Sequence, residues 1–307
     1  QLNQIEISQQ QRAFSTPQFC GSPQLFGLLT GYPCCTSNLH QGWPKLTQNL
    51  WYATPDGGLA AMVYAPSSVE TEVGGRKVKV VERTNYPFEE SVEFEFKVSG
   101  AKAHTFPLHL RLPEWSKSVT VTVNGEAVAV TPVDGVVVLS RGWRSGDVVK
   151  VEFAADIVVN YWFDGGVAVE RGPLLYALKM EERWVRRDVA EADHRKIGKE
   201  FYEVFSSTPW NWGFKRSDVK AENLAKTFSF ERKGEVAHYP WNVESAPMVI
   251  KAKVHEMTTW RAYNGSVGPI NYNMRGGPSE DISPEESVVE LVPYGCTTLR
   301  VTLFPVR

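Results

Sequence analysis

Residues 119–128 read Val-Thr-Val-Thr-Val-Asn-Gly-Glu-Ala-Val, and this stretch decides the fold class. Apolar and polar residues alternate around Asn124-Gly125, which is the pattern of half-buried β-strands. A type I′ turn between two strands needs residues that tolerate a positive φ, and Asn-Gly supplies them. The stretch therefore predicts an antiparallel β-hairpin.

Short runs rich in Val, Thr and Phe continue this period of two on both sides of the hairpin. Turn residues separate the runs at the spacing that is typical of a β-sandwich or a barrel. Within one of them, Glu93 and Glu95 share one face and Phe94 and Phe96 the other, which predicts a solvated face and a core face. The runs lie at 59–64, 77–82, 91–98, 105–112, 118–123, 127–131, 135–139, 147–153, 157–162, 166–171, 173–180 and 247–254, with two more strands within 287–305. A mainly β protein is expected.

Three stretches depart from the strand pattern. Leu39, Trp43 and Leu46 lie near a 3.6-residue spacing, so we expect a helix over 38–52 that Pro44 kinks or restarts. Residues 181–200, which include the carboxylate pair Glu181-Glu182, show no clean apolar face and predict a surface excursion. A short helix is expected within 215–228.

Composition excludes some classes of partner. The chain of 307 residues is long enough for two domains, and its formal net charge of −2 gives no sign of a nucleic-acid partner. No apolar run is long enough to predict a membrane span. Ten tryptophans and eleven tyrosines suit carbohydrate binding, but they equally suit any large all-β protein. The chain begins at Gln1 rather than Met, which suggests a processed product or a piece of a longer protein and indicates no compartment.

The candidate site for chemistry is the vicinal pair Cys34-Cys35. Hydroxyl and amide residues follow the pair and favour a helix N-terminus, where unpaired backbone N–H groups stabilise a thiolate. Adjacent cysteines seldom form a disulfide with each other, because the geometry is strained. Three alternatives remain open: two reduced cysteines with one packed as a small apolar group, two thiolate ligands of zinc, or one nucleophile of lowered pKa.

Spacing alone gives little support for zinc. A zinc site takes four ligands, or three and an open position, and the vicinal pair supplies two. The other cysteines, Cys20 and Cys296, stand in no C-x-x-C spacing.

Several motifs resemble those of one enzyme family. They are Y-P-C-C-T-S-N-L-H-Q-G-W-P-K (32–45), N-L-W-Y-A-T-P-D-G-G-L-A-A-M-V-Y-A-P (49–66), T-N-Y-P-F (84–88), L-R-L-P-E-W (110–115), V-N-G-E (123–126), W-R-S-G-D-V-V (143–149), V-E-R-G-P-L-L-Y (169–176) and L-V-P-Y-G-C-T-T-L-R-V-T-L-F-P (291–305). In combination they resemble glycoside hydrolase family 127, the β-L-arabinofuranosidase family and its relatives.

The resemblance implies a retaining exo-glycosidase with an (α/α)6 barrel followed by two β-sandwiches. In that family a glutamate and three cysteines hold a zinc ion, and a separate glutamate is the acid/base. Carried over, Cys34 would be the catalytic nucleophile and a zinc ligand, and Cys35 a zinc ligand. Zinc would keep the thiolate ionised at neutral pH. The motifs identify no substrate-binding residue.

The chain departs from the family pattern at the site. The acid/base glutamate and the remaining zinc ligands lie upstream of the pair in the family, and here only residues 1–33 precede Cys34. No Glu-x-Cys motif is present, Cys20 is too close to the pair, and Thr36-Ser37 replace the prolines common in the family. Residues 1–55 are also too few for a barrel of about a dozen helices of about eleven residues each.

We therefore expect the C-terminal part of such a glycosidase, inactive by itself and holding Zn²⁺ weakly or not at all. The expected fold is mainly β, with two jelly-roll-like β-sandwiches after the last helix of a truncated (α/α)6 barrel. The expected domains are the end of the barrel at 1–55, a first sandwich at 56–158 plus 285–307, and a second sandwich at 159–284.

Two expectations concern partners. The parent enzyme would act on terminal β-L-arabinofuranosyl or related residues of a plant-type or other arabinose-containing oligosaccharide, and the sandwich edges favour a homodimer. The rival interpretation is a non-catalytic β-sandwich module for carbohydrate binding or assembly, in which Cys34 and Cys35 are relics or packing residues.

Overall fold

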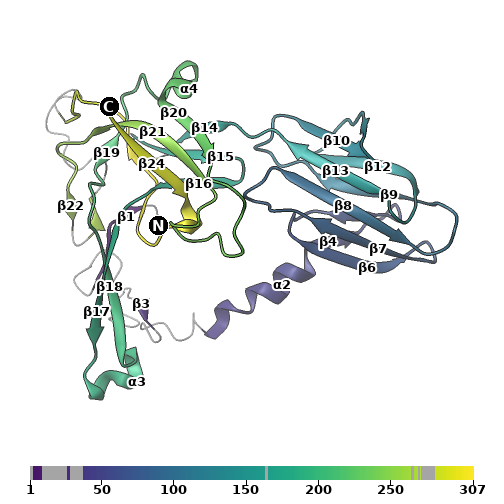
Figure 1. Ribbon diagram of the computed structural model, residues 1–307, viewed down its shortest axis with the longest axis horizontal. Coiled ribbons are helices and arrows are strands. Elements are labelled where there is room, and N and C mark those ends of the chain that lie inside the picture. Colours follow the sequence, from purple (N-terminus) through teal and green to yellow (C-terminus); the bar gives the residue numbers. More distant parts are fainter. Residues whose placement is uncertain are drawn as a thin grey trace. The chain divides into compact units, whose positions relative to one another are not determined.

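The computed structural model describes residues 3–8, 26–27, 37–162, 165–263, 266–268, 270 and 281–307. The chain divides into two compact units, one formed by 1–37 with 157–307 (unit 1) and the other by 38–156 (unit 2) (Figure 1). Both units are built mainly of antiparallel β-strands, as the sequence predicts. No helix within the described ranges has the length and apolar character needed to cross a membrane.

Unit 2, all of whose residues are described, contains two sheets. The six-stranded sheet has the order β11-β10-β13-β8-β7-β6, and the four-stranded sheet has the order β12-β9-β5-β4. All neighbours are antiparallel except β5 and β9, which are parallel. The strands are β4 (Trp51–Ala53), β5 (Leu59–Ala61), β6 (Ser67–Val73), β7 (Arg76–Arg83), β8 (Ser91–Val98), β9 (His104–Arg111), β10 (Val119–Val123), β11 (Glu126–Val128), β12 (Val136–Trp143) and β13 (Val148–Phe153).

The two sheets of unit 2 share one hydrophobic core, which makes this unit a β-sandwich. Phe94 and Phe96 of β8 and Leu108 of β9 are fully buried in it, because alternate residues of each strand point to the same side. On the opposite side of β8, Glu93 and Glu95 pair with Arg83 at 3.7 and 2.5 Å. The predicted core face and solvated face of 91–98 are thus confirmed.

The predicted hairpin at 119–128 is also confirmed. β10 and β11 pair with Val123 opposite Glu126, and Asn124 and Gly125 form the turn with φ of 54° and 83°. Both residues occupy the left-handed region that a type I′ turn requires.

The predicted helix over 38–52 is shorter than expected. Residues 37–39 are helical, a turn follows, and helix α2 (Gly42–Gln48) then begins. Pro44 lies in the first turn of α2, where a backbone N–H would have no intrahelical acceptor, so proline is tolerated there. Trp51 and Tyr52 are in β4 instead, because they pair with Ala61 and Ala60 across the 55–58 turn.

Unit 1 contains an eight-stranded sheet within its described residues. Its order is β14-β15-β16-β24-β21-β19, with β20 paired to β21 and β26 paired to β15. Tyr176, Ile250 and Leu291 are fully buried on its central strands. The strands are β14 (Ile157–Tyr161), β15 (Gly166–Arg171), β16 (Leu174–Leu178), β19 (Trp212–Gly213), β20 (Phe228–Arg232), β21 (Met248–Glu256), β24 (Ser287–Pro293) and β26 (Phe304–Pro305).

The C-terminal strands differ from the expected domain division. β24 lies between β16 and β21, with Leu291 opposite both Leu178 and Ile250. All three side chains are buried, so residues 285–307 complete the sheet of unit 1 rather than returning to the first sandwich. The expected assignment of 285–307 is corrected accordingly.

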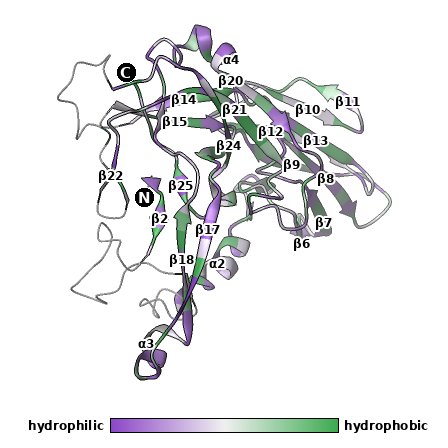
Figure 2. Cartoon of the chain, turned by 60° about the vertical axis from the view of Figure 1, so that its left-hand side comes forward, coloured by the Kyte–Doolittle hydropathy of each residue, from purple (hydrophilic) through white to green (hydrophobic). Residues whose placement is uncertain are grey.

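The surface excursion expected at 181–200 is part of a hairpin formed by β17 (Glu182–Asp188) and β18 (Glu200–Ser206). No residue of β17 is buried. Its sequence therefore lacks the alternation of polar and apolar residues that is typical of a half-buried strand, and Figure 2 colours it mostly hydrophilic. β2 (Glu6–Ile7) and β3 (Phe26–Gly27) pair with β18. The pairing of β17 with β18 is what makes it a strand.

The remaining elements are short. β1 (Asn3–Gln4) pairs with β25 (Arg300–Val301), and β22 (Ala262–Tyr263) pairs with β23 (Ser266–Val267). The helix predicted within 215–228 is present at its end, as a 3-10 turn η3 (Ala221–Asn223) followed by α4 (Leu224–Thr227). The others are η2 (Glu191–Asp193), α3 (His194–Ile197) and η4 (Tyr294–Cys296).

Candidate functional site

The predicted catalytic cysteine and its neighbour lie outside the described residues. This holds for Cys34 and Cys35, and also for Cys20. Their roles as nucleophile and zinc ligands therefore stay predictions. The described residues resume at Ser37, two positions after Cys35, in a helical turn.

The fourth cysteine, Cys296, is unsuited to ligate zinc. Its thiol is buried and donates a hydrogen bond to the carbonyl oxygen of Pro240 at 3.2 Å. Burial raises the pKa of this thiol to about 11, so it is protonated at neutral pH, whereas zinc binds the thiolate. Among the described residues no group of three or more His, Cys, Asp or Glu could hold a metal ion. The described part of the chain therefore does not fit a zinc site by itself.

The helical segment that follows the cysteines carries an uncovered apolar stripe. Leu39, Trp43 and Leu46 recur at helical spacing, with exposed fractions of 82%, 71% and 44%. No residue of α2 is buried. Such a stripe normally faces a core, so this helix has the sequence of a packed helix without a packing partner among the described residues.

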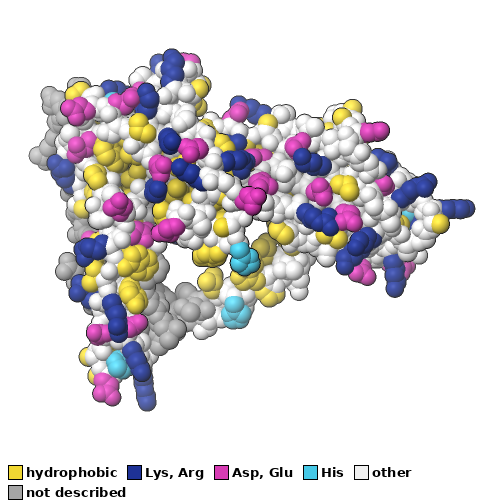
Figure 3. Space-filling model, in the orientation of Figure 1, with side chains coloured by type: hydrophobic (Ala, Val, Ile, Leu, Met, Phe, Trp, Pro, Cys, Tyr) yellow, Lys and Arg dark blue, Asp and Glu magenta, His cyan; other side chains and the backbone are white. Residues whose placement is uncertain are grey.

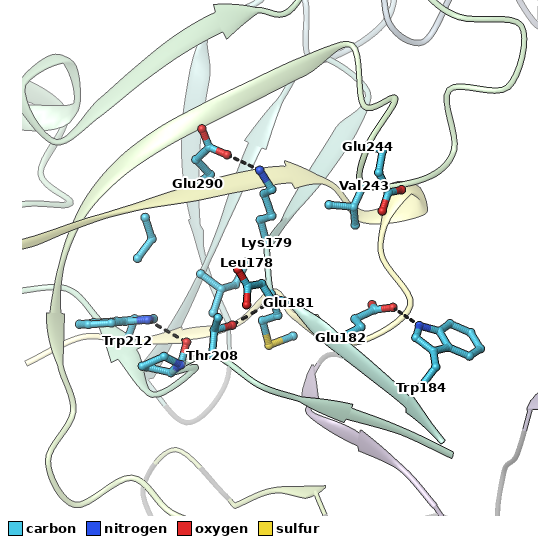
Figure 4. A pocket seen from close by; sticks show the side chains of 13 residues that line it. Leu178, Lys179, Glu181, Glu182, Trp184, Thr208, Trp212, Val243, Glu244 and Glu290 are labelled. Carbon is cyan, nitrogen blue, oxygen red and sulfur yellow. Dashed lines mark hydrogen bonds and ion pairs between the residues drawn. The ribbon is translucent and has the colours of Figure 1, made fainter. Parts of the chain in front are cut away.

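A pocket of about 650 Å³ lies in unit 1, where β16 leads into β17 (Figure 4). Leu178 and Met180, both buried, line it together with residues of β19, β24 and the 243–244 segment. The two exposed carboxylates of Glu181 and Glu244 also line it. The volume falls in the usual range for small-molecule sites. We call it the β16–β24 pocket.

An ion pair marks one side of the β16–β24 pocket. The ammonium group of Lys179 lies 2.6 Å from a carboxylate oxygen of Glu290 on β24, and Lys233 lies 3.6 Å from the other oxygen. The hydrogen bond from Lys179, together with the charges of both lysines, lowers the pKa of Glu290. Lys179 and Glu290 thus neutralise each other at neutral pH.

Glu182 is held by the protein itself. One carboxylate oxygen accepts hydrogen bonds from the backbone N–H groups of Thr298 and Leu299 at 3.1 and 2.9 Å. The other accepts one from Trp184 Nε1 at 3.1 Å. The carboxylate therefore ties the start of β17 to the 298–299 segment and orients the indole.

The second tryptophan of the pocket is fixed in a similar way. Trp212 Nε1 on β19 donates to the carbonyl oxygen of Pro209 at 3.1 Å. Next to it, Thr208 Oγ1 accepts a hydrogen bond from the backbone N–H of Glu181 at 3.2 Å. Figure 4 shows the two indoles at opposite ends of the pocket, with Glu181 and Thr208 between them.

Sequence reasoning singled out Glu181-Glu182 as paired carboxylates but missed the pocket. The lining comes from four separate segments, around residues 178–184, 208–212, 243–244 and 289–290. β24 lies beside β16, and hydrogen bonds from the backbone N–H of Glu181 to Thr208 and from that of Ser207 to Glu181 join the 178–184 and 208–212 segments. The carboxylate pair was the only local signal.

The arrangement suits binding. Two indoles, buried apolar side chains and exposed carboxylates provide apolar contact and hydrogen-bond acceptors for one ligand. Charges of both signs are interspersed over the face shown in Figure 3, without a large patch of one sign. This agrees with the near-balanced composition.

Comparison with known proteins gives a consistent result. The family described as "Beta-L-arabinofuranosidase, GH127 middle domain" matches residues 58–155. These residues cover most of unit 2. A comparison with curated proteins found no match.

Solved structures share the fold at low identity. A GH127 β-L-arabinofuranosidase from Geobacillus stearothermophilus T6 is 22% identical with a TM-score of 0.60, over 89% of this chain and 37% of that one. A glycoside hydrolase is 18% identical with a TM-score of 0.64, over 98% of this chain and 43% of that one. A GH127 β-arabinofuranosidase is 18% identical with a TM-score of 0.59, over 93% of this chain and 41% of that one.

The chain thus spans between 37% and 43% of the length of these structures. The resemblance to glycoside hydrolase family 127 is confirmed, and residues 58–155 are the part of this chain that matches the middle domain of that family.

Proposed function

We propose that this chain is the C-terminal part of a retaining glycoside hydrolase that releases terminal β-L-arabinofuranosyl or related residues from arabinose-containing oligosaccharides. The observation that carries the proposal is the match of residues 58–155 to the middle domain of family 127. The shared fold over 89–98% of the chain supports it.

Helix α2, at the start of unit 2, supports an incomplete catalytic part. Its stripe of Leu39, Trp43 and Leu46 is exposed among the described residues, and the similar structures are more than twice as long as this chain. In the proposal, this helix is the last one of an (α/α)6 barrel, and the stripe packs against barrel helices that precede it. Burial of three large apolar side chains would contribute several kcal/mol.

Cys34 is the proposed nucleophile and zinc ligand, and Cys35 the proposed second ligand, by resemblance to the family. By the same resemblance, the remaining zinc ligands and the acid/base would belong to the rest of the enzyme, and the described residues offer no group of three or more ligands that could replace them. The 307-residue chain is then expected to be inactive by itself.

Two measurements on the purified chain test this proposal. The first is zinc content by elemental analysis of the wild type, Cys34→Ser and, as a matched control, Cys20→Ser. We expect far less than one zinc per chain in all three, since two thiolates hold zinc poorly. The second is turnover of an aryl β-L-arabinofuranoside, where we expect none. Turnover by the 307-residue chain would refute its incompleteness, and stoichiometric zinc lost only in Cys34→Ser would show a more complete site.

A third measurement tests the activity of the whole enzyme. If the coding DNA continues upstream of Gln1 with a helical barrel that carries a Glu-x-Cys motif, the longer protein should release L-arabinose. Loss of its nucleophile through Cys34→Ser should lower kcat by about 10³-fold or more. A longer protein without glycosidase activity would favour the rival interpretation, a non-catalytic carbohydrate-binding or assembly module.

A further inference from the structure

We propose that the β16–β24 pocket of unit 1 is a non-catalytic binding site for a neutral oligosaccharide. The pocket is formed by this chain alone, and its volume of about 650 Å³ is that of a small-molecule site. Its two tryptophans, its buried apolar residues and its two exposed carboxylates are the groups that would contact the sugar.

The two indoles form preorganised platforms. Trp184 Nε1 is tied to Glu182 and Trp212 Nε1 to the Pro209 carbonyl oxygen, each at 3.1 Å, so both rings are held by their edges. Trp184 is 47% exposed and packs against Tyr202 in an edge-to-face contact at 6.1 Å. A ring held in this way loses little freedom on binding, and its face accepts the C–H groups of a sugar ring.

Polar groups stand between and around the platforms. Glu181 and Glu244 are exposed, and in the described part of the chain neither carboxylate forms a hydrogen bond or an ion pair. Both are acceptors for sugar hydroxyl groups, because an ionised carboxylate only accepts. The Thr208 oxygen accepts from Glu181 N–H, which leaves its own proton to donate.

The floor of the pocket is apolar, since Leu178 and Met180 are 1% and 3% exposed. An apolar floor under a polar rim matches the amphipathic form of a sugar, which has apolar ring faces and a rim of hydroxyl groups. The pocket therefore offers each part of a sugar a surface of the matching kind.

Charge argues against other classes of ligand. The lining has four glutamates and one lysine, and Lys179 is already paired with Glu290, so anionic ligands are disfavoured. A cation finds only two uncommitted carboxylates, because Glu182 is held by backbone N–H groups and Glu290 by lysines. Exposed ion pairs add little affinity. A neutral oligosaccharide uses all parts of the lining.

The pocket by itself indicates a neutral oligosaccharide, and the choice of arabinose-containing probes rests on the proposed function. The test is calorimetric titration of the purified chain with arabino-oligosaccharides, and in parallel with xylo- and cello-oligosaccharides. Binding requires no turnover, so it is measured independently of the glycosidase activity proposed above. Spermidine at low and high salt tests the cationic alternative.

Variants locate the binding in the pocket. Trp184→Ala and Trp212→Ala each remove a platform, and Glu181→Gln removes a charged acceptor at nearly unchanged shape. The controls are Trp43→Ala and Glu126→Gln, which change exposed residues of unit 2. Thermal unfolding confirms that each variant is folded, and Trp184→Phe keeps a ring if the alanine variant is unstable.

We expect saturable binding of at least one oligosaccharide series, weakened about tenfold or more by each tryptophan variant and by Glu181→Gln. The controls should bind like the wild type, and added salt should have little effect. No binding of any series at millimolar ligand would overturn the proposal, as would equal binding by wild type and pocket variants. Salt-sensitive binding of spermidine without binding of sugars would replace it with a cation site. Preference for xylo- or cello-oligosaccharides would retain the site and weaken the proposed arabinose specificity.

Discussion

The phenyl ring of Phe96 stacks on the indole of Trp143, with ring centroids 4.3 Å apart and planes inclined by 2°. Phe96 belongs to β8 of the six-stranded sheet and Trp143 to β12 of the four-stranded sheet. Trp143 Nε1 also donates to the carbonyl oxygen of Phe106 at 2.9 Å. Trp143, which is fully buried, therefore connects the two sheets of unit 2, and its indole N–H has a hydrogen-bond acceptor.

Replacing Trp143 should destabilise unit 2 strongly. For Trp143→Ala we expect the free energy of unfolding to fall by about 3–5 kcal/mol, because a large cavity remains and an acceptor loses its donor. Denaturant unfolding monitored by circular dichroism measures the change. Trp43→Ala, at a position that is 71% exposed, should change it by less than about 0.5 kcal/mol. Similar values for both variants would contradict the proposed role of the stack.

Glu82 on β7 should make stability depend on pH. Its carboxylate is buried and accepts hydrogen bonds from Ser67 Oγ at 3.0 Å and from Ala65 N at 3.1 Å. Burial raises its pKa from 4.5 to about 7, an effect that exceeds the opposing one of the hydrogen bonds. The folded state therefore holds the proton more tightly than the unfolded state. The free energy of unfolding should fall as pH rises from about 4.5 to about 7, by about 3 kcal/mol from this group.

The variant Glu82→Gln removes this titration and should flatten the pH profile over that interval. Thermal unfolding between pH 4 and pH 8 tests it. Glu70→Gln, on the neighbouring strand with an exposed side chain, is the matched control and should keep the slope of the wild type. An unchanged slope in Glu82→Gln would show that other groups cause the dependence.

The turn at Asn124-Gly125 should resist substitution for conformational reasons alone. Gly125 has φ of 83° and no atom within 4 Å of the place of a Cβ, so Gly125→Ala brings no clash with a neighbour. The left-handed backbone conformation still costs an alanine about 1 kcal/mol. Gly42→Ala, also in open space but in helix α2, should leave stability unchanged or raise it. Equal effects of the two substitutions in urea unfolding would refute the strain argument.

The buried ion pair between Asp281 and Arg307 should contribute more to the free energy of unfolding than a surface pair does. Arg307 Nε lies 2.7 Å from Asp281 Oδ2, and the two side chains are 3% and 7% exposed. Arg307→Ala leaves a buried carboxylate without its cation, which costs about 3–5 kcal/mol. Lys117→Ala breaks an exposed pair with Asp156 and should cost less than about 1 kcal/mol. The denaturant midpoints of the two variants measure this difference, and equal midpoints would contradict the ranking.

The periodicity of the sequence predicts most of the sheet residues, because buried strands must alternate. β8 and β15 were predicted at their observed bounds, 91–98 and 166–171. β17 was missed, since it has no buried residue and is held by pairing with β18 and not by a pattern of its own. The place of β24 was also missed, because a run of apolar residues does not indicate which sheet it joins.

The two candidate sites illustrate the same limit in different ways. Cys34-Cys35 is a local motif, so sequence alone could propose it, although it lies outside the described residues. The β16–β24 pocket depends on four segments that meet through strand pairing, and only Glu181-Glu182 was visible beforehand. A local sequence pattern does not indicate which distant strands pair, and the pocket depends on that pairing.

The position of β24 affects the order in which the two units can fold during synthesis on the ribosome. Unit 2 is a continuous segment, so its sandwich can form as soon as residue 156 has left the exit tunnel. In the sheet of unit 1, β24 lies between β16 and β21, but it is synthesised about thirty residues after β21 ends. β16 and β21 therefore lack their common partner strand until residues 287–293 emerge. During that interval the edges of β16 and β21 are exposed, and a nascent-chain chaperone would find its binding surface there.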